Sequence, residues 1–114
     1  MLKWVAIVAL LAQSGGALAQ ARPPRMWNLT KFTISEFYLS KPGLSQWGGN
    51  QCKNDKDGTV DVDERLRITD TPAGTYDGKM VDVSGRVCLV KNLKVADGEI
   101  FSVEEKDLTD CTQK

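Results

Sequence analysis

The sequence of 114 residues contains no histidine. Histidine is the side chain that most often acts as a general base near neutral pH, and it is the commonest transition-metal ligand. Its absence excludes imidazole-dependent catalysis and leaves any serine or thiol nucleophile without its usual activating partner. We therefore expect the protein not to be an enzyme, with an enzyme of unfamiliar type as an alternative.

An excess of charge of either sign is also missing, because 15 lysine and arginine residues stand against 15 aspartate and glutamate residues. Nucleic acids and anionic membranes attract proteins that concentrate basic charge. A short basic segment, Arg22–Arg25, is an exception that we interpret as a solvated tail. The overall balance therefore argues against a surface for nucleic acid or for an anionic membrane, and we expect no nucleic acid as a partner.

The one long apolar run, Trp4–Ala12, is much shorter than the roughly 20 residues of a membrane-spanning helix. Lys3 precedes this run and Ala17-Leu18-Ala19 follows it, which is the order of a cleavable secretory signal. We predict a signal peptide over residues 1–19, no membrane span, and a periplasmic or secreted protein. Residues 20–26 are then a flexible basic, proline-containing tail, and residues 27–114 a single β domain.

Segments rich in β-branched and aromatic residues recur at short spacing and are separated by glycine-containing turns. They cover residues 26–40, 59–70, 75–83, 86–95 and 99–103. This pattern predicts an all-β fold, a small antiparallel β-sandwich or open barrel of five to six short strands. We expect residues 26–40 to form two strands or one bulged strand, and the segment after residue 103 to be a helical turn or a charged tail. Residues 41–58 form a long loop in which Trp47 is the only large apolar anchor.

Three cysteines, Cys52, Cys88 and Cys111, follow the signal, so in an oxidising compartment two are expected to pair and one to remain. If the strands alternate up and down, the long loop, the Ser84–Gly85 hairpin and the C-terminal tail gather at one end, together with the cysteines. We predict a Cys52–Cys111 disulfide, with Cys88 free as a small buried hydrophobe.

The acidic segment 54–64 resembles the calcium loop of EF-hands when Gly58 is aligned with its invariant glycine. Four carboxylates then fall at ligand positions: Asp55, Asp57, Asp61 and Glu64. Lys53, however, occupies the first position, where the motif needs a carboxylate. A weak Ca²⁺ site is therefore one hypothesis, and a hairpin turn at Asp57–Gly58 is its alternative.

Several short motifs follow one another over nearly the whole of the chain after the tail. They are N-x-T-x-x-T-I from Asn28, Ser40 at a strand end, W-G-x-N from Trp47, and D-x-x-G-R from Asp82 with Cys88 close behind. Their order resembles a group of uncharacterised small exported β-rich proteins of Gram-negative bacteria. The resemblance implies a small periplasmic β-sandwich and carries no activity, cofactor or site residue.

These observations favour a non-enzymatic β domain that binds an unknown protein or small ligand in the periplasm, as a monomer. Binding is expected at a loop-rich end where Trp47, the acidic hairpin and the cysteines meet. A weak Ca²⁺-binding module that uses the acidic segment is the alternative from another class.

Overall fold

The computed structural model describes residues 22–113, so the predicted signal peptide over residues 1–19 lies outside the described part. None of the helices in that part is long and apolar enough to cross a membrane. Its two 3₁₀ helices are η2 (Gln51–Asn54) and η3 (Glu105–Asp107). The strands are β1 (Arg25–Leu29), β2 (Ile34–Ser40), β3 (Arg65–Arg67), β4 (Gly74–Asp82), β5 (Arg86–Val95), β6 (Ile100–Glu104) and β7 (Leu108–Gln113).

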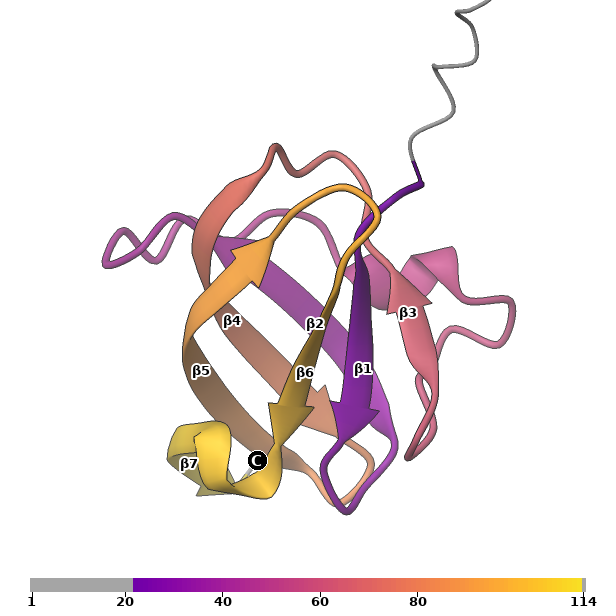
Figure 1. Cartoon of the computed structure of the whole chain (residues 1–114). Coiled ribbons are helices and arrows are strands. Elements are labelled where there is room, and N and C mark those ends of the chain that lie inside the picture. Colours follow the sequence, from indigo (N-terminus) through magenta and orange to yellow (C-terminus); the bar gives the residue numbers. More distant parts are fainter. Residues whose placement is uncertain (1–21, 114) are drawn as a thin grey trace, which may run out of the picture.

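The strands form two sheets, one in the order β3-β1-β6 and the other in the order β2-β4-β5-β7. In Figure 1 the first sheet is the near layer and lies across the second. β1 and β6 run parallel, whereas the other neighbouring strands within residues 22–113 are antiparallel. The prediction of an all-β fold is confirmed, and the two sheets are consistent with a β-sandwich. The expectation of antiparallel pairing alone is wrong, because β1 and β6 are parallel, and residues 22–113 hold seven strands instead of five to six.

The core lies between the sheets, where alternate residues of each strand point inward. Phe37 of β2 and Phe101 of β6 join the two sheets, with ring centroids 6.4 Å apart. Gly78 in the middle of β4 makes room for this packing, because a Cβ there would lie 2.8 Å from Leu93 Cδ1 and 3.3 Å from Phe37 Cε1. Full burial of each large apolar side chain stabilises the fold by roughly 1.5–3 kcal/mol.

The β4–β5 hairpin follows the prediction from Ser84–Gly85. The carboxylate of Asp82 accepts hydrogen bonds from the backbone N–H and the hydroxyl of Ser84, at 3.0 and 2.6 Å. Gly85 has φ +91°, a left-handed conformation that glycine adopts without steric cost. These contacts close the three-residue connection between β4 and β5.

Two segments depart from the expected pattern. β1 begins at Arg25 and Pro24 is already buried, so the tail predicted over residues 20–26 is too long. In the segment 59–70 only Arg65–Arg67 forms a strand, and Val62 is 48% exposed. The reason is a turn at 61–64, where Asp63 adopts φ +71° and donates its backbone N–H to the Asn28 carbonyl.

After β6 the chain makes one 3₁₀ turn and then forms β7, which pairs with β5. The helical turn was expected, but the strand was not. β7 was missed because its sequence, LTDCTQ, alternates no apolar residues, and five of its six residues are exposed.

Candidate ligand-binding groove

A groove of about 530 Å³ opens at the end of the molecule where β2 ends and β4 begins. We call this the groove end, and the opposite end, with the β4–β5 hairpin and η3, the hairpin end. The groove is lined by three segments: the end of β2 with residues 40–41, the loop and η2 over residues 46–54, and residues 69–76 before and within β4. Its volume lies within the ordinary range for small-molecule sites.

The apolar part of the groove comes from Leu39 and Tyr76, which also belong to the core. The Tyr76 hydroxyl donates a hydrogen bond to the carbonyl of Pro72 at 2.7 Å, so the ring is held in place. A ligand here would therefore meet a fixed apolar surface.

A network of neutral side chains holds the two walls of the groove together. Gln51 Oε1 accepts from the backbone N–H of Thr69 and from Asn54 Nδ2, both at 2.9 Å. Gln51 Nε2 donates to the carbonyl of Thr69 at 2.9 Å, and Asn54 Nδ2 donates to the carbonyl of Arg67 at 2.8 Å. Because both amides are satisfied within the protein, they shape the walls and do not need a ligand.

The loop 41–50 is fastened to the edge of β2. Asn50 Oδ1 accepts from the backbone N–H groups of Phe37 and Cys52, both at 3.0 Å, and so caps η2 and the strand edge together. The backbone N–H of Gly48 donates to the carbonyl of Leu39 at 3.0 Å. These bonds occupy a sheet edge that would otherwise be open to another strand.

Charged and polar groups at the rim have no such partners. The side chains of Lys41, Lys53, Asp70 and Gln46 make no hydrogen bond or ion pair with another residue of the described part. Asp70 also has φ +54°, an uncommon conformation for a residue with a side chain. The rim therefore offers two ammonium groups, one carboxylate and one amide to a ligand.

Trp47 is half-buried beside the groove and anchors the loop, as expected. The ammonium of Lys79 lies 5.3 Å from the centroid of a Trp47 ring and 5.2 Å from that of Tyr38. The Tyr38 hydroxyl donates to Glu36 at 2.6 Å, which with burial raises the pKa of Tyr38 to about 12. This stack lies on β2 and β4 and fixes the loop without lining the groove.

The predicted cysteine pairing is wrong, because Cys88 is bonded to Cys111 and Cys52 is free and buried. The sheet order explains the error, since β5 and β7 are neighbours and Cys88 and Cys111 lie across that pair. The prediction that all three gather at one end is also wrong. Cys52 lies against Ile34 of β2, whereas the disulfide joins β5 and β7, which β4 separates from β2.

The free thiol of Cys52 is sealed in the core, 3.8 Å from the carbonyl oxygen of Ile34. Burial is the main reason that the pKa of this thiol is raised to about 12, with smaller contributions from Asp55 and Glu36. A thiol with such a pKa is protonated at neutral pH and is a poor nucleophile.

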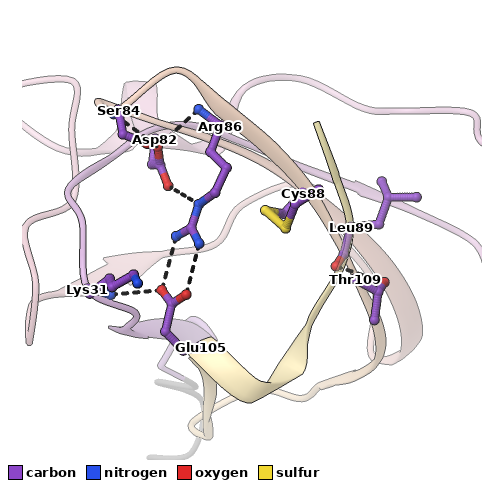
Figure 2. Close-up of a disulfide and its surroundings, with 9 residues drawn as sticks. Lys31, Asp82, Ser84, Arg86, Cys88, Leu89, Glu105 and Thr109 are labelled. Carbon is purple, nitrogen blue, oxygen red and sulfur yellow. Dashed lines mark hydrogen bonds and ion pairs between the residues drawn. A yellow bond between two sulfur atoms is a disulfide. The ribbon is translucent and has the colours of Figure 1, made fainter. Parts of the chain in front are cut away.

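Near the disulfide, Arg86 links two carboxylates at the hairpin end (Figure 2). Its Nε donates to Asp82 at 2.9 Å, and its two terminal nitrogens donate to Glu105 at 2.9 and 3.0 Å. Burial opposes ionisation of Asp82, but hydrogen bonds from Ser84 and Arg86 outweigh it and lower its pKa. The bond from Arg86 likewise lowers the pKa of Glu105, so both groups stay ionised and hold η3 against the hairpin.

The proposed calcium ligands are not brought together. Among residues 22–113 no three acidic or thiol side chains are grouped so that they could hold a metal ion. Asp55 accepts from the backbone N–H of Asp57 at 3.1 Å, and Glu64 accepts from that of Asp61 at 2.8 Å. Two of the four carboxylates thus satisfy backbone groups of this acidic segment, and Asp57 and Asp61 are exposed.

Comparisons with family models, with curated proteins and with solved structures find no match for this chain. The assignment of a site therefore depends on the geometry described above. Sequence reasoning identified the loop but missed Gln51, Asn54 and Thr69. The only signal for them was the concentration of amide and hydroxyl residues on both sides of the acidic segment.

Proposed function

We propose that this protein is a non-enzymatic binding domain that acts after export and holds a small polar ligand in the groove. The observation that carries the proposal is the contrast within the groove between satisfied walls and unpartnered rim. Gln51 and Asn54 are satisfied internally, whereas Lys41, Lys53 and Asp70 are not. Binding sites typically combine such a rigid, partly apolar surface with a few available polar groups.

The rim chemistry suggests the class of ligand. Two ammonium groups and one carboxylate favour a molecule with at least one anionic group, and Leu39 with Tyr76 favours one with an apolar part. Small carboxylic acids and short peptides meet both conditions. The Cys88–Cys111 disulfide supports the proposal of a periplasmic or secreted location, because disulfides persist in oxidising compartments.

The test is a screen by nuclear magnetic resonance of the isotope-labelled protein against mixtures of amino acids, dipeptides, dicarboxylates and disaccharides. We expect a carboxylate-bearing compound to shift the amide signals of Gly48, Gly49 and residues 69–71. Lys53→Gln should weaken the binding of that compound about tenfold, because it removes a charge-assisted hydrogen bond. Lys91→Gln, at an exposed lysine of β5, is the matched control. Shifts confined to residues outside the groove would contradict the proposal.

The calcium hypothesis is tested separately. Since the four carboxylates do not converge, we expect no heat in a calorimetric titration with Ca²⁺ and no change of melting temperature. Heat that disappears in Asp57→Ala would establish a metal site at the acidic segment instead.

A further inference from the structure

The outer face of the β3-β1-β6 sheet carries a second concentration of unpaired charge, on a surface away from the groove. This sheet is the near layer of Figure 1. Its inward residues are buried, while its outward residues alternate with them along each strand. The outward residues are Arg25, Trp27 and Leu29 of β1, Arg65 and Arg67 of β3, and Ile100, Ser102 and Glu104 of β6.

The strand register places three of these side chains in one row across the sheet. Arg25 lies directly opposite Arg67 on one side and opposite Ile100 on the other. Like charges at directly opposed positions destabilise a sheet. Within residues 22–113 neither arginine has an ion-pair partner, so no contact in the described part offsets this repulsion.

The next row holds Arg65, Trp27 and Ser102. The guanidinium of Arg65 lies 4.3 Å from the centroid of a Trp27 ring, a cation–π contact. Trp27 Nε1 donates to Asp63 Oδ1 at 2.9 Å, which fixes the indole. The third arginine is therefore held beside the first two on the same face, and it too makes no ion pair in the described part.

The acidic residues near this face form no ion pair with the three arginines within residues 22–113. Glu104 is at the other end of the sheet, opposite Leu29, and Asp63 accepts the bond from Trp27. Glu99 lies beside Arg25, whose backbone N–H donates to the Glu99 carbonyl at 3.0 Å, but β1 separates it from the two arginines of β3. A balanced total charge thus conceals a local excess of positive charge along β3.

Apolar groups accompany the cations. Ile100 is 42% exposed, and Trp27 is half-buried, so both can contact an apolar phase beside the guanidinium groups. The groove is elsewhere, and this face is the outer side of a three-stranded sheet that presents cations and exposed apolar groups together, the combination that suits a lipid interface. We propose that this face docks on an anionic lipid bilayer, with Arg25, Arg65 and Arg67 at the phosphates and Ile100 in the interface.

The experiment is sedimentation of the processed protein, recovered after export so that residues 1–19 cannot contribute, with two kinds of vesicle. One is pure phosphatidylcholine and the other an equimolar mixture with phosphatidylglycerol. We expect binding to the mixed vesicles only, decreasing with added salt. Each lost arginine should reduce partitioning about fivefold, so Arg65→Gln/Arg67→Gln should reduce it about 25-fold. Ile100→Ser should weaken binding without changing its salt dependence.

The matched control is Lys91→Gln/Lys94→Gln, which removes two exposed cations from β5, and it should change partitioning less than twofold. A melting temperature within the range of the parent protein shows that each variant is folded. Equal binding to both vesicles, equal losses in the arginine and lysine variants, or no binding to mixed vesicles would overturn the proposal. Retention on a heparin column without vesicle binding would likewise overturn it, in favour of a soluble polyanion.

Discussion

The groove end and the hairpin end of the molecule are held together by different chemistry. At the hairpin end, ion pairs of Arg86 with Asp82 and Glu105 lie near a disulfide. At the groove end, neutral bonds of Gln51 and Asn54 join the walls, and the rim charges have no partner in the described part. Charge is thus used for cohesion at one end and stays available to a ligand at the other.

The largest expected effect comes from Arg86→Met. It should reduce the free energy of unfolding by about 4 kcal/mol, because the Asp82 carboxylate stays fully buried without its counter-charge. Urea unfolding measures the loss, and Lys91→Met, at an exposed position of the same strand, should change it by less than about 0.5 kcal/mol. A loss below about 1 kcal/mol for Arg86→Met would show that ion pairs do not hold the hairpin end.

The same ion pairs predict the direction of the pH dependence. The pKa values of Asp82 and Glu105 are lowered from 3.8 and 4.5 in the folded state, so the unfolded chain binds more protons. Their contribution is complete above those ordinary values and is lost as pH falls through the lower folded pKa values. Stability measured below about pH 4.5 should therefore decline less steeply in Arg86→Met than in the parent protein.

Loss of the disulfide is the next largest effect. Cys111→Ser should cost about 3 kcal/mol, the chain-entropy value for a bridge between residues 23 apart. Cys111 is exposed, so the serine itself adds no buried polar group. Hydrogen exchange should accelerate along β7 and leave η2 and residues 69–71 protected. If exchange accelerated equally at the hairpin end and the groove end, the disulfide would not stabilise the hairpin end selectively.

A smaller loss is expected at the groove end. Gln51→Ala leaves the backbone groups of Thr69 without their partners and should cost about 2 kcal/mol in thermal or urea unfolding. Gln46→Ala is the matched control, because Gln46 lines the same groove but its side chain makes no bond in the described part. Gln46→Ala should leave the free energy of unfolding unchanged and weaken only the binding of a ligand. If both substitutions cost the same, the network does not hold the walls.

The smallest effects extend the comparison to the outer face of β3. Arg67→Gln should raise the free energy of unfolding by about 0.5 kcal/mol, since it removes a like charge directly opposite Arg25. Arg65→Gln should lower it by a similar amount, because it removes the contact with Trp27. Urea unfolding measures both changes. A gain for Arg67→Gln and a loss for Arg65→Gln would confirm that Arg67 destabilises the fold and Arg65 stabilises it.

The sequence predicted the hairpin of β4 and β5 well, because the alternation of residues 86–95 and the turn at Ser84–Gly85 are local signals. It also indicated two strands within residues 26–40. It misjudged the first half of the segment 59–70, where the expected strand is broken by backbone bonds between the 61–64 turn and Asn28, far away in the sequence.

Other features depend on which strands become neighbours. The parallel pairing of β1 with β6 and the adjacency of β5 and β7 are long-range outcomes, and the second decides the cysteine pairing. The amide network of the groove was hidden for a different reason. Glutamine, asparagine and threonine form no motif of fixed spacing, and Gln51 meets Thr69 only after the loop folds back.

Burial of Cys52 also bears on how the chain is oxidised. Three thiols allow three different single bridges, and exchange among them requires a thiolate that can reach the bonded sulfurs. Once the core closes over Cys52, the thiol is protonated and out of reach, so the Cys88–Cys111 bond can no longer be reshuffled from within. The odd cysteine is thereby removed from the exchange, and the completed fold retains a single oxidised isomer.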